Sequence, residues 1–277
     1  MAERPISDDW RIPDDLWAEI AWLLPEYKNT HKFGGGRPRT PDRVCMDAIF
    51  FVLRTGCQWK ALDATKFCPG STAHDRFQEW AGATVFYEMW KAGLLEYDCL
   101  KGIGWDWLSM DGSMTKAPLG GEKTGKNPTD RAKRGVKRSV LVESSGVPVG
   151  VAVEGANRND MKMVTETLES IPVDRPEPTT AEPQGMCMDK GYDYDEVREI
   201  VDDFGFTAHI RSRGEEAKEI RRKAGTKARR WVVERTHSWM NRFRGILIRW
   251  NKKPENYIAM LHFAFAIITF RSAGLTG

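Results

Sequence analysis

Apolar residues in the first hundred positions recur every three or four residues, the spacing of a helix with one buried face. The first such helix covers residues 14–24 and ends at Pro25. Further helices are expected over residues 43–54, 71–80 and 84–95. The pattern predicts a helical amino-terminal part with at least one helix–turn–helix candidate.

Short apolar runs replace this spacing from Trp105 onward, and they predict strands. The sequence Ser144-Ser145-Gly146 joins two of them as a hairpin. The expected order is strand 105–110, strands 139–143 and 147–153, helix 157–170, strand 186–188, helix 194–204, strand 206–210, helices near 215–224 and 228–242, and a buried helix over 258–270. Alternating strands and helices after a hairpin predict a mixed α/β sheet flanked by helices. We expect two domains, residues 1–104 and 105–277.

Charge is distributed very unevenly along the chain. Residues 205–253 hold fifteen Lys and Arg against four Glu, and residues 116–138 hold eight against two acids. Residues 139–204 reverse the balance, with five basic and fifteen acidic residues. Two basic segments on either side of an acidic one predict a positive surface that faces a polyanion, although solvated helix faces would explain either segment alone.

Cysteine and hydropathy patterns indicate the compartment. The five cysteines are well separated, with no Cys-x-x-Cys and no zinc-ligand spacing. The most apolar stretch, residues 258–270, is too short to span a bilayer. We therefore expect reduced thiols, no membrane partner and a cytoplasmic protein.

Three acidic residues stand out as candidate metal ligands. Asp111 and Asp189 each follow a short apolar run, so they are expected at strand ends, and Glu234 lies on a helix within a basic stretch. Carboxylates fixed in this way can hold two Mg²⁺ ions against a phosphodiester. Taken singly, the two Asp-containing sequences are equally typical of turns, and Glu234 is typical of an exposed helical residue paired with a nearby arginine.

The chain resembles, over almost its whole length, bacterial insertion-sequence transposases with an Asp-Asp-Glu triad, specifically insertion sequence family five. The resemblance is carried by eight ordered segments: Leu23-Leu24-Pro25, Gly35-Gly36-Arg37-Pro38-Arg39, Leu53-Arg54-Thr55-Gly56-Cys57-Gln58-Trp59, Met110-Asp111-Gly112-Ser113, Asn127-Pro128-Thr129-Asp130-Arg131, Gly155-Ala156-Asn157, Asp189-Lys190-Gly191-Tyr192 and Arg230-Trp231-Val232-Val233-Glu234-Arg235-Thr236.

This resemblance implies a ribonuclease-H-like catalytic fold with Asp111, Asp189 and Glu234 as catalytic metal ligands. It also implies two Mg²⁺ ions, for which Mn²⁺ substitutes, and cleavage and strand transfer at terminal inverted repeats. Two positions depart from the wider family signature. Asn241 stands where related proteins carry Lys or Arg, and Lys227 stands where a tyrosine is expected.

Basic residues are the candidate DNA contacts, because Lys and Arg position a protein on phosphates without reading sequence. The stretch Gly36-Arg37-Pro38-Arg39 is typical of an arm that enters a narrow minor groove. The helix 71–80 is a candidate for the major groove. Trp59, Trp80 and His262 are expected to be structural. The candidate contacts are Arg37, Arg39, Arg76, Lys116, Lys126, Arg131, Lys137, Arg230, Arg235 and Arg242.

The preferred hypothesis is a DNA transposase acting on the double-stranded terminal repeats and target DNA, as at least a homodimer because two DNA ends must be held together. Two alternatives remain open from the sequence. One is a nuclease of the same fold that cuts without joining, and the other is a DNA-binding protein without catalysis. A glycosidase would also use paired acids, but the flanking positive charge does not suit it.

Overall fold

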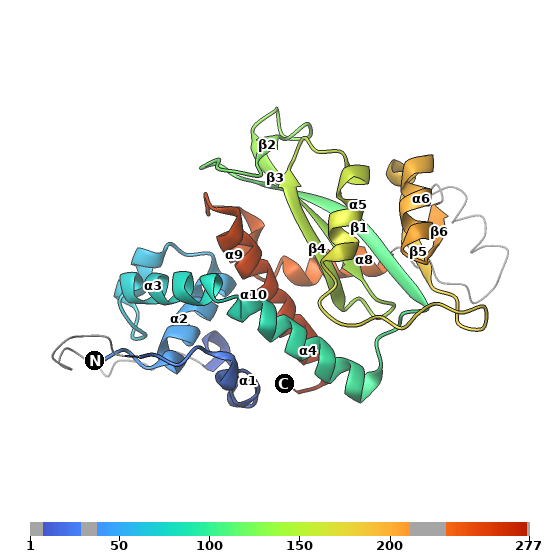
Figure 1. Cartoon of the computed structure of the whole chain (residues 1–277). Helices are drawn as coiled ribbons and strands as arrows, with labels where there is room; N and C mark the ends of the chain where they lie inside the picture. Colours follow the sequence, from blue (N-terminus) through green and yellow to red (C-terminus); the bar gives the residue numbers. More distant parts are fainter. Residues whose placement is uncertain (1–7, 29–37, 211–230, 276–277) are drawn as a thin grey trace.

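The computed structural model describes residues 8–28, 38–210 and 231–275 of the chain (Figure 1). The amino-terminal part is helical, as expected. Its elements are η1 (Asp8–Trp10), α1 (Asp14–Ile20), η2 (Ala21–Leu23), α2 (Asp42–Thr55), η3 (Trp59–Ala64), α3 (Gly70–Gly82) and α4 (Val85–Lys101). Gly56 ends α2 with a positive φ of 69°, and an added Cβ would lie 2.9 Å from the Arg244 carbonyl oxygen, so a side chain is excluded there.

The remainder forms a mixed sheet with its helices. The strands are β1 (Trp107–Lys116), β2 (Gly125–Lys126), β3 (Arg134–Val142), β4 (Pro148–Gly155), β5 (Gly185–Met188) and β6 (Thr207–Ile210). The helices are η4 (Asp160–Met163), α5 (Val164–Glu169), η5 (Lys190–Tyr192), α6 (Asp195–Asp203), α8 (Trp231–Met240), α9 (Arg244–Leu247) and α10 (Pro254–Ala273). The helix expected near 215–224 lies outside the described residues.

The strand order confirms the expected ribonuclease-H-like sheet. Strands β1, β3 and β4 form an antiparallel meander, and β5 and β6 continue the sheet parallel to β1. The short β2 pairs with the start of β3. Cys187 near the end of β5 pairs with Ser109 of β1 in parallel register, so the carboxyl end of β5 lies beside the middle of β1.

Helices cover both faces of this sheet. The hydroxyl of Ser139 on β3 accepts a hydrogen bond from Thr167 of α5, whereas the neighbouring Arg138 donates to the Ile246 carbonyl of α9. Adjacent strand residues point to opposite faces, so α5 covers one face and the α8–α9 segment covers the other. Figure 1 shows α5 in front of the sheet and α8 behind it.

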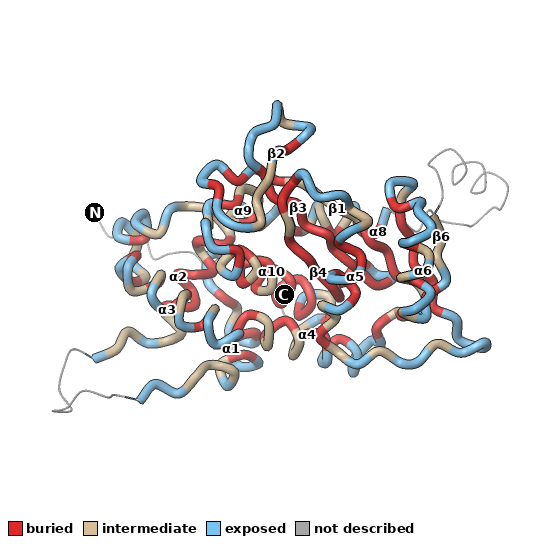
Figure 2. Tube along the Cα trace, turned by 45° about the horizontal axis from the view of Figure 1, so that its top comes forward, coloured by how far each residue is buried: buried red, intermediate tan, exposed pale blue. Residues whose placement is uncertain are grey.

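The hydrophobic core is continuous across both parts of the chain (Figure 2). The carboxy-terminal helix α10, longer than the expected 258–270, packs along α4. The Phe263 ring lies 5.1 Å from Phe86 and 6.3 Å from Phe50, centroid to centroid. Trp80 is fully buried, which confirms its structural role. None of the helices within the described ranges is long and apolar enough to cross a membrane. The division at residue 104 stays a prediction.

Candidate active site

Asp111 lies within β1 rather than at its end, which corrects the expected strand end at residue 110. The reason is that β3 pairs with β1 as far as Lys116, through contacts that the short apolar run does not signal. The Asp111 side chain is 31% exposed, and its Oδ1 accepts a hydrogen bond of 2.8 Å from the Gly112 amide. The carboxylate is therefore held on a fixed backbone but reachable from solvent.

Asp189 follows β5 directly, where the sequence predicted it. Its side chain caps η5 by accepting a hydrogen bond of 2.7 Å from the Gly191 amide. The neighbouring Tyr192 is buried, and burial raises the pKa of its phenol well above the usual range, with the negative charges of Asp160, Asp111 and Asp189 acting in the same direction. Asp111 on β1 and Asp189 directly after β5 thus both raise the pKa of one phenol.

Glu234 lies exposed on α8, which packs against β1 and β3. His237 follows it by three residues, so the two side chains project from the same side of the helix. The His237 Nε2 lies 4.0 Å from Oδ2 of Asp111. Helix α8 therefore brings the face that bears Glu234 toward the strand that bears Asp111.

His237 has an unusual environment for a histidine. Burial lowers its pKa to about 4, and the nearby positive charge of Arg138 adds to the effect, so the imidazole is neutral at pH 7. Within the described part of the chain, neither buried ring nitrogen has a hydrogen-bond partner. The helical periodicity had placed His237 beside Glu234, but the sequence could not show that its ring faces Asp111.

No three His, Cys, Asp or Glu side chains form a group placed to hold a metal ion within residues 8–28, 38–210 and 231–275. The coordination of metal by Asp111, Asp189 and Glu234 therefore stays a prediction. The donors nevertheless suit a hard divalent cation, because carboxylate oxygens are the ligands that Mg²⁺ prefers. Asp111 is also partly open to solvent, and the Nε2 of His237 lies 4.0 Å from its Oδ2.

Asp160 is a site residue that the sequence did not single out. Its Oδ2 accepts a hydrogen bond of 2.7 Å from Lys137, on the sheet face opposite Asp111. Its Oδ1 occupies the space beside Gly112, only 2.1 Å from where a Cβ would stand. The sequence predicted only that Asp160 lies near the start of a helix. Its pairing with Lys137 could not be predicted, because the two residues are 23 positions apart. Gly112 is thus required for close packing behind Asp111.

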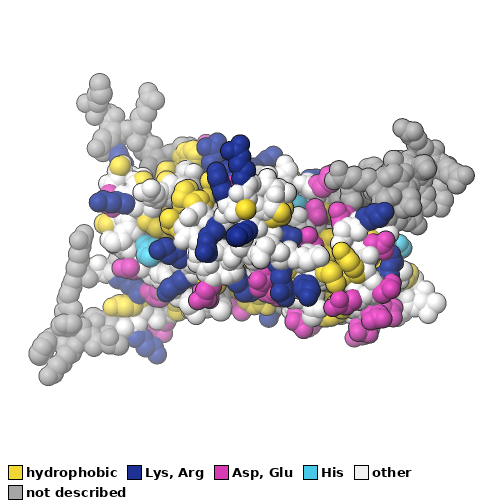
Figure 3. Space-filling model, turned by 90° about the horizontal axis from the view of Figure 1, so that it is seen from above, with side chains coloured by type: hydrophobic (Ala, Val, Ile, Leu, Met, Phe, Trp, Pro, Cys, Tyr) yellow, Lys and Arg dark blue, Asp and Glu magenta, His cyan; other side chains and the backbone are white. Residues whose placement is uncertain are grey.

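The candidate DNA contacts differ in their exposure. Lys126, Arg131 and Arg242 are exposed, and Lys116 is exposed with a loose ion pair of 3.7 Å to Asp130. Figure 3 shows Lys and Arg side chains gathered over the middle of one face, and Asp and Glu side chains toward the end that carries α6. Arg37 and Arg230 lie outside the described residues.

The remaining candidates are engaged within the protein. Lys137 is 7% exposed and paired with Asp160, which corrects its expected place in an open basic segment. Arg235 is half-buried, with its guanidinium 4.5 Å from the ring centroid of Trp231 and 4.9 Å from that of Trp239, and it donates to the Ser145 carbonyl. These contacts suit structural roles better than direct phosphate contact.

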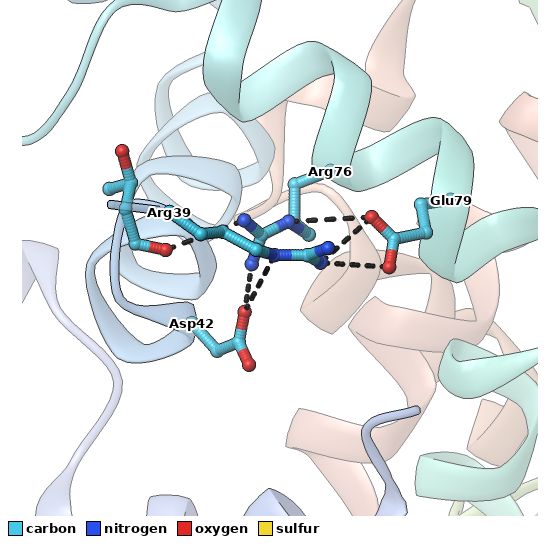
Figure 4. Close-up of polar contacts among 5 residues, drawn as sticks. Arg39, Asp42, Arg76 and Glu79 are labelled. Atoms are coloured by element: carbon cyan, nitrogen blue, oxygen red, sulfur yellow. Dashed lines mark hydrogen bonds and ion pairs between the residues drawn. The ribbon is translucent and has the colours of Figure 1, made fainter. Parts of the chain in front are cut away.

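Arg39 and Arg76 belong to one ion-pair network between α3 and the start of α2 (Figure 4). Both oxygens of Glu79 accept hydrogen bonds of 2.8 Å from Arg39, and Asp42 pairs with Arg76. Arg76 is only 5% exposed, and burial lowers its pKa. A solvated arginine on the major-groove face of helix 71–80 was expected, and the structure corrects this for Arg76, because Asp42 and Glu79 draw it inward.

Comparison with known proteins establishes the class. Residues 106–269 match the family model described as "Transposase DDE domain", and residues 12–90 match the one described as "Putative transposase of IS4/5 family". The chain therefore belongs to the DDE transposases of the IS4/5 type. Members of this family catalyse metal-dependent cleavage and strand transfer of DNA, so the chain is an enzyme of the DNA transposase class.

Two relatives come from Burkholderia cepacia. The "Putative transposase for insertion sequence element IS402" is 32% identical over 155 residues, which cover 55% of this chain and 71% of the relative. The "Insertion element IS402 uncharacterized 16.2 kDa protein" is 31% identical over 118 residues, 42% of this chain and 80% of the relative.

Among solved structures, the piggyBac transposase synaptic complex with hairpin DNA has a TM-score of 0.42 at 10% identity, over 96% of this chain and 75% of that one. The Mos1 strand transfer complex has a TM-score of 0.29 at 10% identity, over 90% and 81%. The fold assignment rests on the strand order and not on these likenesses.

Proposed function

We propose that this transposase binds the terminal inverted repeats of an insertion sequence at the bacterial nucleoid. In this proposal Asp111, Asp189 and Glu234 hold two Mg²⁺ ions, for which Mn²⁺ substitutes. The observation that supports it most is the approach of α8 to β1, with His237 Nε2 4.0 Å from Asp111 Oδ2 one helical turn after Glu234. The placement of Asp189 at the end of β5, beside β1, adds the third carboxylate.

The three carboxylates would divide the coordination between them. Asp111 from β1, Asp189 directly after β5 and Glu234 from α8 would supply the carboxylate oxygens that hold the two ions. When bound, the ions would activate the attacking oxygen and stabilise the leaving oxygen of an in-line displacement. Buried Arg138, which donates to Ser113 Oγ at 3.3 Å, supplies fixed positive charge on the same face of the sheet.

Two displacements at phosphorus would then follow in order. Water attacks the phosphodiester at the transposon end and the 3′ oxygen leaves, taking up a proton to become a hydroxyl. That hydroxyl attacks a target phosphodiester, so one bond to phosphorus forms and one breaks in each step. No covalent link between protein and DNA is needed. Because two ends must be held together, we propose at least a homodimer on DNA.

The test is a joining assay with purified protein, a labelled terminal-repeat duplex, a target plasmid and Mg²⁺. Wild-type protein should give a labelled strand joined to the plasmid, and Asp111→Asn, Asp189→Asn and Glu234→Gln should each lower the yield at least a hundredfold. Glu199→Gln, an exposed carboxylate on α6, is the matched control and should keep full activity. Cleavage without joining would instead indicate a nuclease. Normal joining by all three variants would contradict the catalytic role of Asp111, Asp189 and Glu234.

A further inference from the structure

A cavity of about 630 Å³ lies where the amino-terminal helices meet the carboxy-terminal segment. Residues of η3 and α3 line one side, and the turn between α9 and α10 lines the other. Its volume falls within the roughly 300–1,000 Å³ usual for small-molecule and cofactor sites. A second cavity of about 790 Å³ shares Gln78, Lys253 and Asn256 with it, so the hollow continues along the protein.

The α3 side of the cavity is aromatic. The Trp59 ring lies 5.2 Å from His74 and 5.3 Å from Phe77, centroid to centroid, and all three residues line the cavity. Trp59 packs against the core, in keeping with its expected structural role, but it is only half-buried. Planar rings of this kind stack on nucleobases of any sequence.

Amide side chains add hydrogen-bonding groups to these rings. Gln58, Gln78, Asn251 and Asn256 all line the cavity. The terminal amide nitrogen of Gln78 is buried and has no hydrogen-bond partner within the described residues. An unpaired buried donor is costly unless something else accepts its hydrogen bond, and amide groups complement the edges of bases.

The opposite rim is a rigid, basic turn. Trp250 is 48% exposed there, and Lys252 and Lys253 are exposed beside it. Arg249, which is fully buried, holds the turn by donating to the carbonyls of Asn251, Lys252 and Lys123 at 2.9, 2.9 and 3.1 Å. An exposed tryptophan on a fixed backbone is preorganised for binding.

We propose that this cavity binds an unpaired DNA base. The base would lie against the aromatic side and Trp250, its edge would meet the amide groups, and the flanking phosphates would lie on Lys252 and Lys253. This inference rests on one part of the proposed function, namely that the protein binds DNA. It needs neither the carboxylate triad nor joining activity. The two exposed lysines on the rim of the cavity favour a base within a strand over a free nucleotide, because a strand carries phosphates on both sides of the base.

The test compares two fluorescein-labelled duplexes by anisotropy, one fully paired and one identical except for a single unpaired adenine. Wild-type protein should bind the second about tenfold more tightly, a typical effect of one stacked base. Trp250→Ala should bind both duplexes equally, with its affinity for the paired duplex unchanged. Trp22→Ala is the matched control, since Trp22 is 72% exposed and does not line the cavity, and it should keep the preference.

A second measurement separates the contribution of the lysine charges to DNA affinity from the contribution of the stacked base. The double variant Lys252→Gln and Lys253→Gln should weaken binding of both duplexes and make it less dependent on salt. Equal binding of the two duplexes by wild-type protein, or a preference that survives Trp250→Ala, would overturn the inference. Complete competition by dAMP at the concentration of the duplex would also overturn it, in favour of a free-nucleotide site. Failure to bind either duplex would overturn the proposed function itself.

Discussion

Gly112 follows Asp111 directly, and its lack of a side chain is needed for the packing of the site. Asp111 faces α8, and the next residue must leave room for Asp160 on the other face of β1. Asp160 in turn neutralises Lys137, which would otherwise be a buried unpaired charge. One glycine thus lets a paired acid and base pack directly behind the proposed metal ligand.

Gly112→Ala should therefore lower the free energy of unfolding by about 1–3 kcal/mol, because the new methyl group would lie 2.1 Å from the Asp160 Oδ1. Urea denaturation measures this. Gly82→Ala is the control, since an added Cβ there meets no atom within 4 Å, and its stability should stay equal or rise. Equal stability of wild type and Gly112→Ala would show that Asp160 moves away freely.

Individual residues also show how far the sequence could predict the site. Asp111, Asp189 and Glu234 could be singled out because each lies in a short motif with its own neighbours. The burial of Arg76 and Lys137 could not, because their partners Asp42 and Asp160 lie 34 and 23 residues away. From sequence alone a basic residue is predicted to be exposed to solvent, because a partner so far away in the chain cannot be identified. The orientation of His237 toward Asp111 depends in the same way on the docking of α8.

Among the elements, periodicity predicted the helices and most strands, since one buried face leaves a regular trace in the sequence. The end of β1 was placed too early because strand length depends on pairing with β3, which continues through polar residues. Helix α10 was predicted to be buried, but its partner α4 was not, because an all-apolar helix does not indicate which neighbour it packs against. His262 of α10 stacks on Trp90 of α4 at 5.2 Å.

The packing of α10 against α4 predicts how the free energy of unfolding changes at acid pH. Burial lowers the pKa of His262 to about 4, below its ordinary value near 6.5, so the unfolded chain binds more protons between those values. Its contribution to folding is complete above about pH 6.5 and is lost as the pH falls toward 4. His262→Phe keeps an aromatic ring and removes the titration.

The decrease in unfolding free energy between pH 7 and pH 4 should be about 3 kcal/mol smaller for His262→Phe than for wild type. Urea denaturation at pH 7, 5.5 and 4 measures both. Parallel curves for the two proteins would contradict the burial of a neutral imidazole between α4 and α10.

For the molecule as a whole, the surface charge follows the segregation seen in the sequence. Lys and Arg gather over one face, and acidic residues collect around α6 (Figure 3). Such a distribution orients a polyanion before any specific contact forms. We propose exposed Lys126 and Arg131 as the phosphate contacts of their segment, because Lys137 in the same segment is buried.

Replacing both Lys126 and Arg131 by Gln should weaken duplex binding and reduce the slope of log affinity against log salt by about 0.9 for each lost phosphate contact. Anisotropy titrations between low and moderate salt give the slope. Arg198→Gln, in the acidic helix α6 and paired with Asp193, should leave it unchanged. A wild-type slope in the double variant would place the DNA on another face.

The central claim is that Asp111, Asp189 and Glu234 converge on two cations, and a crystal structure of the protein with Mn²⁺ and a terminal-repeat duplex tests it most directly. Anomalous scattering should show two peaks about 3.5–4 Å apart, both in contact with Asp111 and each with one of the other two carboxylates. Peaks bound elsewhere, or a Glu234 carboxylate that points away from both ions in the DNA complex, would contradict the claim.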